Sequence, residues 1–187
     1  MRAIGELVDA FRRREGKAVT RARNLIVAAL AAGRKCYHYD RQHLVGRVLG
    51  PERGGMPDWI SPAAENTAFG RGDVLVIGSQ LGAVDREVAY AEAAASAGAK
   101  IVVVAGRPAR SALGTAGRPT SGRTLWDVAD VGISTHVPMT DGVVDIKGLD
   151  RPFGPASGAM GLVAFWSLAA AVSARLAWKG FSFKVAE

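Results

Sequence analysis

Residues 72–82 read Gly-Asp-Val-Leu-Val-Ile-Gly-Ser-Gln-Leu-Gly. Within them, Asp73–Ile77 is a short apolar run of the kind found in parallel strands that are buried on both faces. The residues after this run have apolar side chains at helical spacing, at Val84, Val88, Ala91 and Ala95. A second apolar run, Lys100–Val104, follows directly after Gly98. Together these features predict a β-α-β unit with parallel strands and a right-handed crossover.

The alternation of helices and strands continues on both sides of this unit. Apolar spacing before Gly33 predicts two helices or one bent helix, which the glycine ends. The other expected strands are 36–39 and 131–134, with an extra one at 143–146, and the other expected helices are 41–49, 124–129 and 156–174. The Gly- and Pro-bearing stretches 50–62 and 107–123 are expected to be loops. This order predicts an α/β fold with a doubly wound, mostly parallel, Rossmann-like sheet flanked by helices. We expect one domain over residues 1–187, with 1–33 as an N-terminal helical segment.

Composition indicates a folded protein of the cytoplasm. The chain has 187 residues, 49% of them hydrophobic and 22% charged, which is enough to bury a sizeable core and argues against disorder. Cys36 is the single cysteine and excludes an intrachain disulfide. Glu6 and Asp9 interrupt the region where a signal peptide needs an apolar core.

One stretch resembles a membrane span by length. Residues 156–174 contain no charged side chain, and a run of about 20 such residues can cross a bilayer as a helix. The run is rich in Ala, Gly and Ser, however, and Pro155 and Ser157 are helix-start signals. We therefore predict a buried or subunit-interface helix and no membrane association.

The net charge favours an anionic partner. The formal charge is +7 and the isoelectric point is near 10.1. The densest basic stretch, residues 12–23, lacks interleaved aromatic side chains for stacking on bases. We interpret it as a solvated helix face, and nucleic-acid binding is the least favoured function for this chain.

The turn after the first apolar strand is the predicted ligand site. Ligands of doubly wound folds lie at the carboxyl ends of the strands. Here Ser79 offers a hydroxyl, Gln80 an amide and Gly82 a close backbone approach, while the following helix start supplies free N–H groups. These features predict a phosphate site, although a purely structural turn explains the same residues. The spacing matches neither a dinucleotide fingerprint nor a P-loop, so no cofactor is expected.

The same residues resemble the phosphosugar-binding core of the sugar isomerase (SIS) family. In that family an apolar strand leads into a Ser-rich turn that closes on glycine, then a helix, then a Gly-Ala-x-hydrophobic strand. Gly98-Ala99-Lys100-Ile101 is similar to the last element. Ser79 and Gly82 stand where the family has its first turn serine and its glycine, and Leu81 replaces the second serine.

The resemblance covers most of the chain. Residues 125–131 resemble the short helix that leads into an Ala-Asp-hydrophobic strand, and residues 154–157 resemble the turn that opens the C-terminal helix, which implies a ligand contact for Ser157. Residues 34–39 are similar to the first strand. His43 falls where small uncharacterised members have a Gly-His-Ser turn, and its neighbours differ from that pattern: Asp40, Arg41, Gln42 and Leu44. The nearest relatives implied are small stand-alone and phosphoheptose-isomerase-like proteins.

This resemblance implies binding of a small phosphorylated sugar, with or without turnover. Aldose–ketose isomerisation moves a proton between neighbouring carbons through an enediol and needs a base. Glu65, His43 and His136 are the candidate bases, although a loop glutamate is often only solvated and a lone histidine is often structural. A non-catalytic sensor of phosphosugars is the alternative.

Metal binding and self-association complete the expectations. His38, Asp40 and His43 are close in sequence, but alternation puts only the first two on one face and no second ligand cluster appears, so no metal site is predicted. The family resemblance and the apolar helices at both chain ends predict a homodimer or homotetramer.

Overall fold

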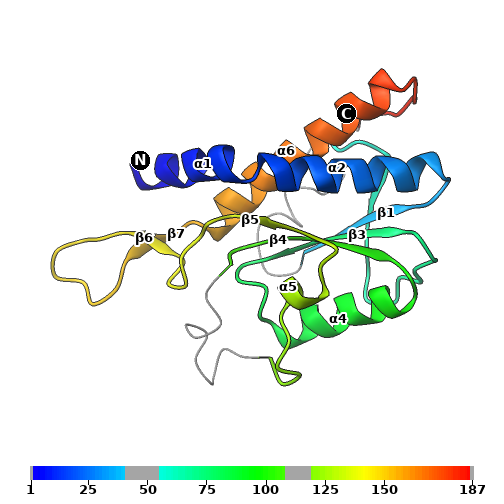
Figure 1. Ribbon diagram of the computed structural model, residues 1–187. Helices are drawn as coiled ribbons and strands as arrows, with labels where there is room; N and C mark the ends of the chain where they lie inside the picture. Colours follow the sequence, from blue (N-terminus) through cyan, green and yellow to red (C-terminus); the bar gives the residue numbers. More distant parts are fainter. Residues whose placement is uncertain (1, 41–54, 108–118, 186–187) are drawn as a thin grey trace.

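The computed structural model (Figure 1) describes residues 2–40, 55–107 and 119–185. Its main sheet has five parallel strands in the order β2-β1-β3-β4-β5. Their bounds are β1 Cys36–Tyr39, β2 Ile60–Pro62, β3 Val74–Ser79, β4 Lys100–Ala105 and β5 Val131–Ser134. The register places Val74 of β3 between Cys36 of β1 and Lys100 of β4. The predicted β-α-β unit and the mostly parallel sheet are therefore confirmed.

Helices cover both faces of this sheet (Figure 1). One face carries α1 (Arg2–Arg14), α2 (Gly16–Ala31) and α6 (Ser157–Trp178), and the other carries α4 (Asp85–Ser96) and α5 (Leu125–Val128). Side chains of a strand alternate between faces, so Val74 and Val76 belong to the first core while Leu75 and Ile77 belong to the second. Burial on both faces is the reason why β3 and β4 have unbroken apolar sequences.

The N-terminal segment forms two helices, which meet at Glu15. Gly33 has a φ of +70° and follows the end of α2, so the predicted stop is confirmed. The left-handed conformation there favours glycine because it lacks a Cβ.

One prediction for the loops was wrong. The predicted loop 50–62 ends in β2, an edge strand in which the Ile60 side chain is buried. Pro62 has no N–H, but an edge strand needs ladder bonds on one side only, so the sheet tolerates it there. The extra strand expected at 143–146 is present as β6 (Gly142–Val144), and it pairs antiparallel with β7 (Phe153–Pro155) outside the main sheet. The helix predicted at 41–49 lies outside the described residues.

The charge-free segment forms α6, the one helix among the described residues that is long and apolar enough to cross a membrane. In the fold it packs against α2, α1 and β4. Side chains at helical spacing, Met160, Ala164, Leu168 and Val172, are buried in the first core. Packing therefore accounts for much of the apolar character of this helix, as the sequence predicts for a core helix.

Candidate functional site

A pocket lies at the carboxyl edge of the sheet, where β1 and β3 are neighbours. After β1 the chain forms β2 on one side of it, then returns to place β3 on the other side. Connections that leave two adjacent strands in opposite directions open a crevice at their carboxyl ends, which is the general ligand position in doubly wound folds. The pocket at this point is lined by His38, Tyr39, Asp40, Val76, Gly78, Ser79, Val104, Ser157, Gly161 and Phe165.

The turn after β3 is held by its own serine. Ser79 is buried, and its Oγ accepts a hydrogen bond of 3.0 Å from the N–H of Gly82. Gly82 has a φ of +69°, and a Cβ there would lie 3.1 Å from Nε1 of Trp126. The carbonyl of Gln80 accepts a 2.8 Å bond from the N–H of Gly106 in the next strand's turn. Two hydrogen bonds thus hold this turn in place, and the Ser79 hydroxyl keeps its proton for another acceptor.

The end of β1 adds two polar groups that the sequence analysis did not assign to the ligand. His38 is 8% exposed and packs edge-on against Phe165, and among the described residues its buried Nδ1 has no hydrogen-bond partner. Burial lowers the pKa of His38 to about 4, so its ring is neutral at neutral pH. The carboxylate of Asp40 lies over Gly78, where a Cβ would come 3.0 Å from Oδ2. The missing side chain of Gly78 thus makes room for Asp40 beside Ser79.

Ser157 also lines the pocket, at the start of α6. The N–H groups of Ala156 and Ser157 both donate to Oδ1 of Asp141, at 3.0 and 2.7 Å, and the Ser157 hydroxyl donates to Oδ2 at 2.8 Å. A carboxylate of the chain itself therefore occupies the anion-favouring N-terminus of this helix. A ligand phosphate would have to share or replace these bonds.

The predicted bases lie away from the pocket or outside the described residues. Glu65 forms an ion pair with Arg86, and both side chains are more than half exposed. Nε2 of His136 lies 2.9 Å from Oε1 of Glu15, at the carboxyl end of β5. Neither Glu65 nor His136 is among the residues that line the pocket, and His43 lies outside the described residues. Of the predicted ligand contacts, the pocket brings together Ser79 and Ser157, while Gln80 and Gly82 shape the turn.

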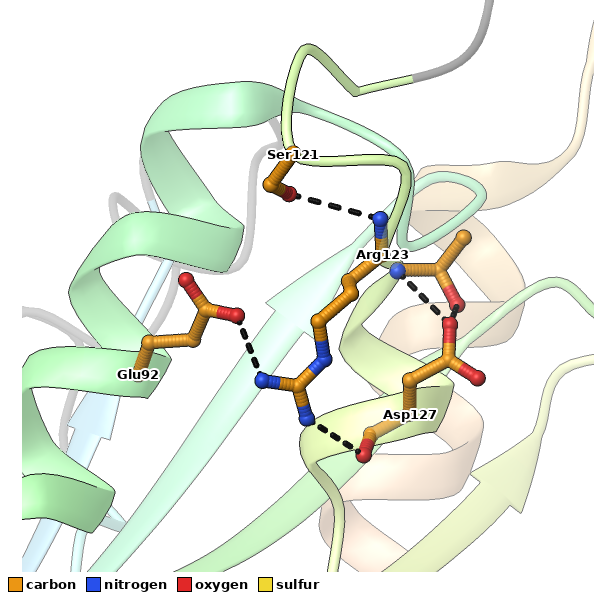
Figure 2. Close-up of polar contacts among 5 residues, drawn as sticks. Glu92, Ser121, Arg123 and Asp127 are labelled. Carbon is orange, nitrogen blue, oxygen red and sulfur yellow. Dashed lines mark hydrogen bonds and ion pairs between the residues drawn. The ribbon is translucent and has the colours of Figure 1, made fainter.

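Residues 120–123, which lead into α5, form hydrogen bonds with charged side chains of α4 and with the backbone of α5. Asp85, in the first turn of α4, accepts a 2.8 Å bond from Oγ1 of Thr120. Arg123 donates to the carboxylate of Glu92 at 2.8 Å and to the carbonyl of Asp127 at 3.0 Å (Figure 2). The bonds to Asp85 and Glu92 thus join the residues that lead into α5 to α4.

One cation stands at the end of β4. The guanidinium of Arg107 lies 5.0 Å from the ring centre of Trp126, and Nε1 of Trp126 donates to the carbonyl of Gly106 at 3.0 Å. Trp126 also contacts the Gly82 position, so Arg107 belongs to the same edge of the sheet as the Ser79 turn. Arg107 follows closely after the apolar strand β4, and this position could have identified it from the sequence as a candidate ligand contact.

Other anion or metal sites find less support. In residues 2–40, 55–107 and 119–185, no three His, Cys, Asp or Glu side chains gather as metal ligands would. The basic side chains at the junction of α1 and α2, including Arg13, Arg14 and Lys17, are exposed, as expected for a solvated face.

No protein-family model matches the chain. A UPF0309 protein from Brucella anthropi is 30% identical over 122 residues, which are 65% of this chain and 48% of that protein. The chain thus spans about half the length of this curated relative.

Solved structures share the fold over nearly the whole chain. A candidate phosphosugar isomerase involved in capsule formation from Bacteroides fragilis has a TM-score of 0.61 at 16% identity, covering 97% of this chain and 88% of its own. A protein from Methanococcus jannaschii, for which a 3-hexulose-6-phosphate isomerase function is inferred, has a TM-score of 0.60 at 12% identity, with 93% and 89% covered. A candidate sugar-phosphate isomerase from Listeria monocytogenes has a TM-score of 0.55 at 14% identity, with 97% and 88% covered. The predicted resemblance to the sugar isomerase family is confirmed at the level of the fold.

Proposed function

We propose that this chain, which has the fold of the candidate phosphosugar isomerases, binds a small phosphorylated sugar in the pocket between β1, β3 and α6. The observation that carries the proposal is the position of the Ser79 turn. It combines a buried hydroxyl, a tight glycine-bearing backbone and a helix start at the point where the strand order reverses.

The groups around the pocket divide between the two parts of such a ligand. The phosphate is expected at the Ser79–Gly82 turn, where the Ser79 hydroxyl donates and the positive charge of Arg107 stands at the same edge. The sugar is expected over the end of β1, because the neutral ring of His38 and the carboxylate of Asp40 are suited to hydroxyl groups.

The finer proposal is that the bound sugar is isomerised between aldose and ketose. This reaction needs a base near the carbon that loses its proton. Asp40 is the carboxylate among the residues that line the pocket, so we assign the role of base to Asp40. The ion pair of Glu65 with Arg86 and the contact of His136 with Glu15 favour the second candidate function, a phosphosugar sensor without turnover.

A thermal-shift screen against sugar phosphates, the same sugars without phosphate, and short oligonucleotides tests the binding function. A ligand that binds the folded state alone raises Tm by mass action. We expect a rise with one or a few sugar phosphates and none with the free sugars. A rise with oligonucleotides alone would show that the basic face, and not the pocket, is the functional surface.

The variant Asp40→Asn then separates the enzyme from the sensor. If Asp40 is the base, this variant keeps affinity for the sugar phosphate but loses the conversion of aldose to ketose, followed by NMR of the sugar. Absence of conversion by the unaltered protein, with binding intact, would support the sensor.

Self-association is part of the same proposal. Large apolar side chains are exposed on and around the β6–β7 hairpin: Val144, Ile146, Leu149 and Phe153. A second copy of the chain would cover them and so remove their apolar surface from water. Light scattering coupled to size exclusion tests this, and a monomer at all concentrations would contradict it.

A further inference from the structure

Glu87 is a buried acid that the proposed binding mode does not use. It lies in the first turn of α4, where its side chain is 3% exposed. Within the part of the chain that the structure describes, neither of its carboxylate oxygens has a hydrogen-bond partner. Glutamate is rarely buried without a partner, because an ionised carboxylate loses its hydration there. A group of this kind in a folded protein therefore requires an explanation.

Glu87 faces the serine of the ligand turn. Side chains alternate along β3, so Leu75, Ile77 and Ser79 point toward α4. Burial raises the pKa of Glu87 to about 7, the nearby Ser79 hydroxyl opposes this rise, and the negative charge of Asp40 adds to it. The Ser79 hydroxyl is thus near enough to act on the carboxyl group, although the two do not meet the geometry of a formed hydrogen bond.

The hydrogen-bonding capacity of Ser79 links the two groups. A serine hydroxyl has one proton to donate and two lone pairs that accept. One lone pair of Ser79 already accepts the N–H of Gly82. An ionised Glu87 can only accept, so it draws the Ser79 proton away from the pocket. A protonated Glu87 can donate to the second lone pair, which leaves the Ser79 proton for an acceptor in the pocket.

Resting on the proposed function, we propose that Glu87 is a positioning residue whose protonated carboxyl group donates to Ser79 and so directs the Ser79 hydroxyl toward the anionic group of the ligand. Anion binding is then coupled to a proton on Glu87. Charge repulsion also favours the protonated form of Glu87 when an anion is bound, because an ionised Glu87 beside Asp40 would place two negative charges next to that anion.

Other charged groups around α4 are engaged elsewhere. Across the sheet, β4 presents apolar side chains to α4: Ile101, Val103 and Ala105. On α4 itself, Asp85 is bonded to Thr120, Arg86 to Glu65, and Glu92 to Arg123. On α5, Asp127 is bonded to Thr124. Tyr39, at the end of β1, stacks on Tyr90 of α4. His38 titrates near 4, well below the range in which Glu87 changes its charge.

Inorganic sulfate is the probe for this coupling, because its charge is constant between pH 6 and 8. With one linked proton, the Kd of sulfate is expected to rise by up to about tenfold over this range in the unaltered protein. Calorimetry in two buffers of different ionisation enthalpy should show uptake of part of a proton near pH 7. Glu87→Gln, which donates without ionising, is expected to bind with a Kd that changes less than twofold.

Two controls make the result specific. Glu92→Gln, at a partly exposed position on the same helix, should keep the pH dependence of the unaltered protein. Ser79→Ala should weaken sulfate binding and flatten its pH dependence, because Glu87 acts through that hydroxyl. No proton uptake by the unaltered protein, or an undiminished pH dependence in Glu87→Gln, would overturn the role of Glu87. Absence of sulfate binding at every pH would instead contradict the proposed function, and the role of Glu87 with it.

Discussion

Nε2 of His136 lies 2.9 Å from Oε1 of Glu15, although the two residues are 121 positions apart in the sequence. The other oxygen of Glu15 accepts a 3.0 Å bond from the backbone N–H of Ser134. Glu15 stands where α1 ends and α2 begins, so one carboxylate joins the N-terminal helices to the carboxyl end of β5. Both side chains of the pair are less than one fifth exposed.

We predict that Glu15→Ala lowers the free energy of unfolding by about 1–3 kcal/mol, since it leaves a backbone N–H and a histidine ring without their acceptor. Urea denaturation measures this. Glu92→Ala is the matched control, because its ion pair with Arg123 is more exposed than the Glu15 contact and is expected to contribute less than about 1 kcal/mol. Equal effects of the two substitutions would show that the Glu15 contact is not structural.

Ser79→Ala should weaken binding of a sugar phosphate by about 1–3 kcal/mol, the cost of losing a hydrogen bond to a charged group. Titration calorimetry with the sugar phosphate that gives the largest thermal shift measures the loss. Ser96→Ala, at the exposed far end of α4, is the control and should bind normally. Unchanged affinity in Ser79→Ala removes the hydroxyl from the site.

The raised pKa of Glu87 predicts that the stability of the folded protein decreases as the pH rises. In the unfolded chain its carboxyl group titrates near 4.5, and in the folded protein near 7. Between these values the folded state holds a proton that the unfolded state has lost, so stability decreases as pH rises through this window. Glu87→Gln lacks this loss and should be more stable than the unaltered protein by about 2–4 kcal/mol at pH 8, with a much smaller difference at pH 4.5. Parallel stability curves for the two proteins would contradict the buried acid.

Gly132 of β5 is predicted to tolerate no side chain. A Cβ at this position would overlap the ring of Trp126 at Cζ3. Gly132→Ala should therefore move Trp126, change its fluorescence and lower stability by about 1–3 kcal/mol. Gly158→Ala, in α6, has open space around the new Cβ and should be neutral or stabilising. A loss of stability in Gly158→Ala that matches the loss in Gly132→Ala would argue against the packing explanation.

Much of the fold was predictable because its signals are local. The apolar runs of β3 and β4 are buried on both faces, and the bounds expected for β1 and β5 agree with the structure. Strand β2 was not predictable because three residues ending in Pro62 are too few to show a periodicity. The strand forms through its pairing with β1, which is a contact between separate segments and leaves no local signal in the sequence.

The candidate site was predictable only in part. Ser79 and Gly82 form a turn within a few residues, so the sequence sufficed to predict it. Asp40 and Glu87 reach the same turn from other elements, and their approach depends on the packing of the sheet. One signal for Glu87 was present, because it lies at helical spacing from Val84 and Ala91, on the face whose burial the pattern predicts.

The most direct test of the proposed binding site is a titration of the ¹⁵N-labelled protein with the sugar phosphate selected by thermal shift, followed residue by residue in the NMR spectrum. We predict the largest changes at the backbone amides of residues 79–82 and of Asp40. The largest changes at the basic face of α1 and α2, between residues 12 and 23, with none at the turn, would contradict the proposed binding site.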